Sequence, residues 1–215
     1  GKDECIRFVF LTGVTKLGKM SIFSGLNNLN DISMDLRYAD ICGISESELQ
    51  ANFDASVEEL AAVCGLAKEK CYAKLARMYD GYHFHPKAIG VYNPFSLLNT
   101  FYANEFRMYW FQTGTPSFLV RYLQAGRYNL DSISKDGVSV ETLTGANYVS
   151  PAPITLMYQT GYLTIKDYDD RFGTYTLDYP NEEVKTGFLN SLSQLYTPAL
   201  ARGDFSVAKF VTDIE

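Results

Sequence analysis

Two threonines and a lysine stand close together just after an apolar run near the start of the chain. The run Phe8–Leu11 ends at Thr12 and Gly13, and Thr15 and Lys16 follow. Two hydroxyl groups and one ammonium group suit an anionic ligand such as the phosphates of a nucleotide. The same residues also fit a purely structural role, in which a buried strand leads into a capped surface loop.

The apolar run must position these side chains if they bind a ligand. Aromatic and β-branched residues stopped by a glycine predict a short buried strand over residues 8–11. Ligands of open α/β sheets bind outside the carboxyl ends of strands, which is where the loop after Leu11 would lie. We expect a second short strand within residues 34–43. The lysine would then face a cleft that a neighbouring strand completes.

The middle of the chain predicts helices with defined ends. Ser45 followed by Glu48 has the spacing of a capping box. Apolar residues recur at helical spacing over residues 57–64, which Gly65 would end, and again over residues 67–79. A short turn between these two helices predicts an antiparallel pair.

Aromatic residues are dense from residue 92 to residue 111, beginning with a helix start. Asn93 and Pro94 have the residue types of an N-cap and a first helical position. Aromatic side chains that stack on bases are accompanied by a basic groove, but here Arg107 stands alone among them. Packing in a core or at a domain interface is therefore the favoured interpretation.

Residues 153–188 predict the element order of a winged helix. The expected elements are a helix over 154–159, a strand over 162–165, a loop over 169–173, a strand over 174–177 and a helix capped by Asn181. Glu182 and Glu183 suit the positive end of that last helix. Aspartates outnumber Lys166 and Arg171 around the hairpin, whereas a DNA-reading wing needs basic residues. A structural or protein-contacting role is favoured.

Composition limits the classes of function. The chain has 215 residues, a net charge of −6, 47% hydrophobic and 20% charged residues, which is ordinary for a soluble protein with a packed core. We expect no membrane span and no secretory signal. Four cysteines without a C-x-x-C pair suggest a reducing, cytoplasmic setting. With two histidines, His83 and His85, we expect no zinc site, and we interpret both as solvent-facing loop residues rather than catalytic ones.

Nucleotide hydrolysis needs parts that this sequence lacks. A phosphate-cradling G-x-x-x-x-G-K-[ST] loop is absent, because Gly18 and Lys19 are followed by Met20 and have no upstream pattern. A strand ending in paired acids is absent as well. We therefore expect no catalytic residue and no metal site in this chain, which alone would neither grip nor hydrolyse ATP.

Several motifs carry a resemblance to a known family. In order they are FVFLTGVTK, SIFSGLNNLNDIS, ADICGIS, YDGYHF, VYNPFSLLN, YWFQTGTPSFLV and YQTGYLTI. Together they resemble the AAA-ATPase-like family of bacterial P-loop ATPases of the signal-transduction type. Its members have an ATPase core, a helical lid, a winged-helix-like part and a PD-(D/E)XK nuclease-like domain. The resemblance implies that this chain begins near the last strands of the core and stops before the nuclease-like domain.

The resemblance also implies roles for particular residues. Thr12, Thr15 and Lys16 would sense the γ-phosphate, and the segment Tyr92-Asn93-Pro94 would lie against the adenine. The phosphate loop and the paired acids would lie upstream of Gly1. ATP and magnesium would then be cofactors of the full-length protein. The partners would be the rest of its own chain and other proteins, with neither nucleic acid nor membrane expected.

The expected fold class is α+β, mostly α. We expect the edge of an ATPase sheet over residues 1–44, a helical lid over 45–127, a winged-helix-like subdomain over 128–200 and a hinge over 201–215. The expected function is to couple ATP binding to a downstream effector. The alternative is a self-contained winged-helix module that binds protein or nucleic acid.

Overall fold

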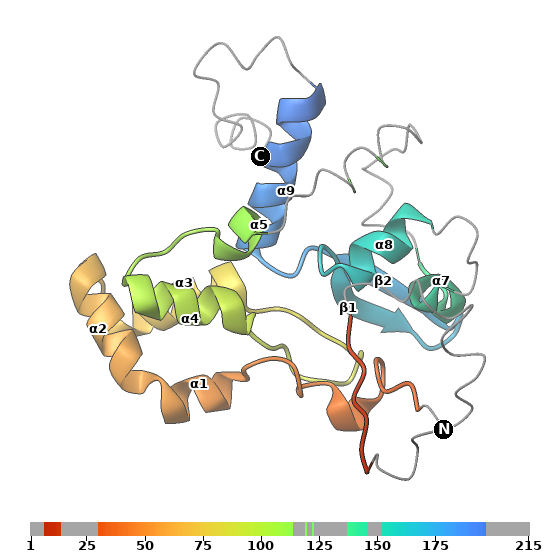
Figure 1. The fold of residues 1–215 in the computed structure, drawn as a ribbon, viewed down its shortest axis with the longest axis horizontal. Coiled ribbons are helices and arrows are strands. Elements are labelled where there is room, and N and C mark those ends of the chain that lie inside the picture. Colours follow the sequence, from red (N-terminus) through yellow and green to blue (C-terminus); the bar gives the residue numbers. More distant parts are fainter. Residues whose placement is uncertain are drawn as a thin grey trace.

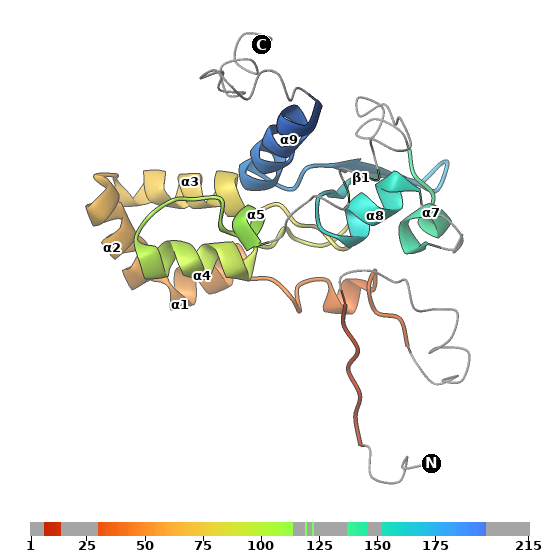
Figure 2. The ribbon, with the colours of Figure 1, turned by 45° about the horizontal axis from the view of Figure 1, so that its top comes forward.

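A computed structural model describes residues 7–13, 30–113, 119, 122, 137–145 and 152–196 of the chain. The described part is mostly helical, with one two-stranded sheet, and so belongs to the α+β class expected from sequence. Helices α1 to α4 gather on one side, and α7, α8 and the strands gather on the other (Figure 1). Helix α9 rises between the two groups, with α5 at its base (Figures 1 and 2).

The first group begins with two helices whose ends were predicted. Helix α1, Glu46–Asn52, starts at a complete capping box in which Ser45 and Glu48 satisfy each other's backbone donors. Helix α2, Asp54–Cys64, ends at Gly65 in the left-handed conformation. The predictions for both ends are confirmed, because capping depends on residues only three or four positions apart.

Helices α3, Lys68–Tyr79, and α4, Pro94–Ala103, complete the first group. We call its buried residues the helical core; they are Leu49, Val57, Leu60, Ala61, Cys71, Leu75, Tyr79, Tyr92 and Leu97. Short extended contacts, Ile44 with Tyr92 and Tyr82 with Val91, hold the chain between the helices. The apolar stripes that predicted α2 and α3 therefore face this core.

The second group surrounds an antiparallel hairpin. Strands β1, Thr164–Asp169, and β2, Thr174–Asp178, pair with each other, and an isolated bridge joins Val138 to Tyr175 of β2. Helices α7, Val140–Thr144, and α8, Pro153–Gln159, cover the hairpin, and α9, Glu182–Tyr196, follows it. The predicted helix, hairpin and final helix are all present in the predicted order.

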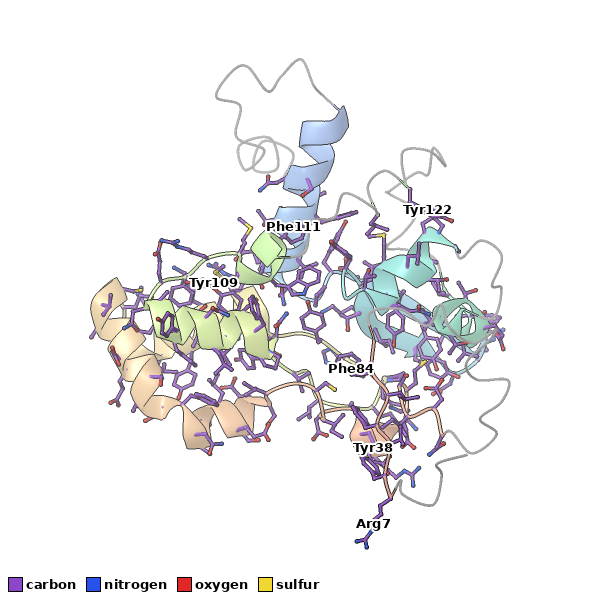
Figure 3. All side chains as sticks on the ribbon, viewed as in Figure 1. Arg7, Tyr38, Phe84, Tyr109, Phe111 and Tyr122 are labelled. Carbon is purple, nitrogen blue, oxygen red and sulfur yellow. The ribbon has the colours of Figure 1, made fainter. Side chains whose placement is uncertain are left out.

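The buried residues of the second group form the C-terminal core: Leu119, Val138, Leu143, Leu156, Met157, Tyr162, Leu163, Ile165, Leu177, Val184 and Phe188. Helix α5, Tyr109–Thr113, packs on this core through Trp110 and Phe111. Figure 3 shows Phe111 between α5 and α9. The dense aromatics thus divide between two cores, since Phe101 and Phe106 pack on the helical core. Packing, the interpretation favoured from the sequence, holds for Phe101, Phe106, Trp110 and Phe111. Phe95 and Tyr102 of the same stretch are instead exposed, at 45% and 92%.

The structure contradicts two of the predicted strands. Residues 8–11 form no strand, and their side chains are exposed, with Phe8 at 81%. Residues 34–43 contain a short 3-10 helix, Leu36–Tyr38, whose start is capped by Asp35. A strand needs a hydrogen-bonded neighbour, and none lies beside either segment among the described residues. Figure 2 shows residues 7–13 projecting away from the rest.

Helix α5 lies within the predicted lid range yet packs with the C-terminal core. The predicted domain boundaries at 44 and 127 remain predictions, and the expected hinge over residues 201–215 falls outside the described residues. Among the helices that the structure describes, none combines the length and apolar character needed to cross a membrane.

Candidate functional site

The predicted phosphate-sensing residues are only partly described. Thr12 lies at the end of the projecting segment and is exposed. Thr15 and Lys16 lie outside the described residues. In both ribbon views residues 7–13 lie apart from α4 (Figures 1 and 2). The nucleotide site remains a prediction.

The predicted adenine-contacting residues have structural roles. Tyr92 is 1% exposed, and its hydroxyl donates to Glu46 Oε2 at 2.5 Å. Burial, with the Glu46 carboxylate beside it, raises the pKa of Tyr92 far above its ordinary value. Asn93 accepts from the backbone N–H of Phe95 at 3.0 Å, and Pro94 is the first residue of α4, so the predicted cap is confirmed. Contact of these residues with adenine remains a prediction.

A buried carboxylate, which sequence reasoning treated as a helix-start charge, links three helices. Glu183, in the first turn of α9, is 1% exposed. Its Oε2 accepts from Ser96 Oγ of α4 at 2.7 Å, and its Oε1 accepts from the backbone N–H of Trp110 in α5 at 2.9 Å. Burial raises the pKa of Glu183, while the two donors act in the opposite direction by stabilising the ionised form.

The segments that follow α3 and precede α9 are also tied together. Asn181 Nδ2 donates to the carbonyl oxygen of Asp80 at 3.0 Å. Lys166 Nζ donates to the carbonyl oxygens of Gly81 and Pro180, at 3.3 and 3.2 Å. A Cβ added at Gly81, where φ is +96°, would come within 2.2 Å of the Pro180 oxygen, so only glycine fits this approach.

We call these residues the polar joint; they are Asp80, Gly81, Ser96, Trp110, Lys166, Pro180, Asn181 and Glu183. The joint connects the helical core to the C-terminal core through hydrogen bonds rather than through apolar packing alone. Asp80 adds a buried Oδ1 that accepts no hydrogen bond from the described residues. Burial raises the pKa of Asp80 as well.

The two histidines lie in the loop that runs beside the joint. The backbone N–H of His83 donates to Thr164 Oγ1 at 2.7 Å, and Thr164 Oγ1 donates back to the His83 carbonyl at 3.0 Å. His85 Nδ1 accepts from the backbone N–H of Lys87 at 3.1 Å. These contacts place both histidines in a loop, as expected, but both are half-buried rather than solvent-facing.

The polar groups of the joint therefore hold the chain segments in position. The Glu183 carboxylate, the Ser96 hydroxyl and the Lys166 ammonium group are engaged with backbone atoms or with each other, which suits a structural connection more than acid–base catalysis. The buried Oδ1 of Asp80 is the exception. In the described part of the chain, no group of three or more His, Cys, Asp or Glu side chains is arranged to hold a metal ion.

Sequence reasoning missed Glu183 and Asp80 as joint residues. Glu183 follows the N-cap Asn181, so the usual interpretation is an exposed charge near the helix start. Its neighbour Glu182 fits that interpretation, because it is exposed and pairs with Arg77 at 3.0 Å. A signal was present in the apolar spacing, since Val184 and Phe188 lie on the buried face of the same helix.

Comparison with known proteins finds a longer relative of this chain. No family model matches the sequence, and no solved structure matches it significantly. The chain is 40% identical over 199 residues to a curated protein of Azotobacter chroococcum mcd 1, named "Uncharacterized protein in vnfD 5'region". The match covers 91% of this chain, and the chain spans 36% of that relative's length. The relative thus has a large part with no counterpart in this chain.

Proposed function

We propose that this chain is the C-terminal part of an AAA-ATPase-like protein and couples ATP binding to a downstream, nuclease-like effector. In this proposal the helical core is the lid over the nucleotide. A displacement of this lid on ATP binding would reach the effector through the C-terminal core and α9. The ATPase activity belongs to the whole protein, because the phosphate loop and paired acids are absent here. The setting proposed is the cytoplasm.

The observation that carries the proposal is the polar joint. It connects the first turn of α4, where nucleotide contact is predicted, with the start of α9. Two cores joined by directed hydrogen bonds suit the transmission of a change in geometry, because such bonds have a defined direction and length.

The order of elements in the C-terminal core supports the winged-helix assignment. The strand-like bridge at Val138 lies against β2, and β2 lies against β1. Helices α7 and α8 separate Val138 from the hairpin in sequence. This is the arrangement expected of a winged helix whose first strand is short.

The exposed run Phe8–Leu11 supports the presence of a neighbouring part. Its four apolar side chains are 50–81% exposed. An apolar segment that pairs with no strand among the described residues is a template for strand pairing, and folded proteins usually cover it. The greater length of the Azotobacter relative is consistent with a region that could supply such a strand.

Titration with ATP and magnesium tests the proposal in the protein that carries this sequence. We expect calorimetry to detect binding and Lys16→Ala to weaken it by about tenfold or more, because a charged hydrogen bond to phosphate is lost. Lys19→Ala is the matched control, since it removes the same charge three residues away. Absence of binding, or equal effects of both variants, would contradict the nucleotide role.

The second candidate is a self-contained module that binds another protein or a nucleic acid. The hairpin exposes Asp167, Asp169, Asp170 and Asp178, which favours a basic protein partner over a polyanion. Fluorescence anisotropy with duplex DNA tests the nucleic-acid form. Binding whose affinity falls steeply with salt would support it, and no binding at low salt would exclude it.

A further inference from the structure

The hydrogen bonds of Glu183 disfavour a partial separation of α9 from α4 and α5. Both of its oxygens are engaged, and the side chain has almost no access to water. Ser96, its partner in α4, is fully buried. A buried carboxylate that loses one donor has no solvent to replace it, so partial separation of the helices is disfavoured. Contacts of this kind are either formed or broken.

The partner of Glu183 in α4 belongs to the same turn as the helix cap. The Ser96 backbone N–H points to Asn93 Oδ1 at 3.4 Å, while its hydroxyl donates to Glu183. Thr100 Oγ1 donates to the Ser96 carbonyl at 2.8 Å, one turn further along. Any displacement of Asn93 or Pro94 therefore moves the Ser96 hydroxyl.

A second contact fixes α9 against α5 on the same face. Gly187 lies one turn after Glu183, and a Cβ built there would come within 2.4 Å of the Phe111 ring. The absence of a side chain thus lets the ring lie on the α9 backbone (Figure 3). Phe111 follows Trp110, whose N–H is held by Glu183, so the two contacts act on one short segment.

We propose that the Glu183 carboxylate is the coupling residue through which the first turn of α4 sets the position of α9. Displacement of Ser96 breaks one of its two hydrogen bonds, and α9 then separates from α4 and α5. Use of this coupling in signalling rests on the proposed function. The mechanical coupling does not, and its test needs no nucleotide, so its failure is distinguishable from a failure to bind ATP.

The test uses hydrogen exchange measured by mass spectrometry, together with the fluorescence of Trp110. Trp110 is the single tryptophan of the chain, and its ring lies 5.1 Å from that of Tyr162, so its emission reports on the joint. The variants are Ser96→Ala, Glu183→Gln, Glu183→Ala and the double variant Ser96→Ala with Glu183→Ala. Glu182→Gln is the matched control, because Glu182 is an exposed neighbour on the same helix.

We expect Ser96→Ala to speed exchange in residues 184–190 by about tenfold, because a hydrogen bond to a charged group is lost. Glu183→Ala is expected to do the same and to shift the Trp110 emission. In the double variant the Ser96 change should add almost nothing, since its route is already removed. Glu182→Gln should leave the exchange rates and the Trp110 emission near those of the wild type. Glu183→Gln should change both by an amount between those of Glu182→Gln and Glu183→Ala.

Additive effects of Ser96→Ala and Glu183→Ala would overturn the proposal, as would changes no larger than those of Glu182→Gln. If Glu183→Ala does not fold, Ser96→Ala and Glu183→Gln test the proposal instead. Ser96→Ala must then speed exchange in α9 more in the wild-type background than beside Glu183→Gln, and equal effects in both would refute the coupling.

Discussion

The ionisation of Glu183 is set by two opposing effects at one residue. Burial disfavours the charged form, and the donors from Ser96 and Trp110 favour it. Burial is the larger effect and raises the pKa above its ordinary value of 4.5. Tyr79 and Tyr82, the titratable groups that feel this charge from the α3 side, have pKa values raised by burial, that of Tyr79 to about 12. Both tyrosine hydroxyls are therefore neutral at neutral pH.

A raised carboxyl pKa predicts a specific dependence of stability on pH. The folded protein binds this proton more tightly than the unfolded chain, so the contribution to stability is complete below the unfolded pKa and is lost as pH rises through the folded pKa. Glu183→Gln removes the titration. In urea titrations we therefore expect the free energy of unfolding of Glu183→Gln to rise relative to that of the wild type as pH increases above about 4.5. A difference that stays constant with pH would contradict this expectation.

Two substitutions at Tyr92 separate the contribution of its ring to stability from the contribution of its hydroxyl group. Tyr92→Phe removes the bond to Glu46, whose carboxylate is exposed and can be hydrated, so we expect a loss of about 1 kcal/mol or less. Tyr92→Ala also empties a fully buried site in the helical core, which should cost about 3–5 kcal/mol. Urea unfolding measures both. Similar losses would show that the hydroxyl, rather than packing, holds this residue.

At the scale of elements, the closest approach is that of α5 to α9 at Gly187. Alanine at a helical glycine normally stabilises a helix by about 1 kcal/mol, because glycine has greater freedom in the unfolded chain. Here the new methyl group would meet the ring of Phe111. The contact between the helices therefore opposes the intrinsic preference of α9.

We expect Gly187→Ala to destabilise the protein despite its favourable propensity, by about 1–3 kcal/mol as for other overpacked sites. In a Phe111→Ala background the same change should be neutral or stabilising, since the ring that it meets is gone. Chemical denaturation of the four proteins in this cycle gives the answer. Destabilisation of equal size in both backgrounds would exclude the contact with Phe111 as the cause.

At the scale of the whole molecule, two hydrophobic cores share one joint. The two cores are separate clusters of buried residues, and the hydrogen bonds of Glu183, Lys166 and Asn181 cross between them. Cooperative unfolding of both cores depends on such contacts.

We expect far-UV circular dichroism and Trp110 fluorescence to give coincident unfolding curves in the wild type. Circular dichroism reports mainly on the helices, whereas Trp110 reports on the C-terminal core. Removing the joint with Glu183→Ala should separate the two curves, with the fluorescence change moving to lower denaturant concentration. Curves that separate in the wild type would show that the cores are independent without any mutation.

Local sequence predicted the parts of this fold whose causes are local. The caps at Ser45, Asn93 and Asn181 follow from side chains that satisfy backbone donors two or three residues away. The hairpin and the helical stripes follow from apolar spacing in the same way. The run Phe8–Leu11 has the composition of a strand, but strand formation needs a neighbour that composition does not supply.

The sequence by itself determined the ends of several helices, the hairpin with the helices on either side of it, and the α+β, mostly α, class of the described chain. Tertiary structure alone decided that Glu183 is buried while Glu182 is exposed, because only packing brings Ser96 and Trp110 to one of these carboxylates. It also decided that Gly187 accepts an aromatic ring and that Gly81 accepts a carbonyl oxygen. These contacts join residues up to about a hundred positions apart, which no local pattern encodes.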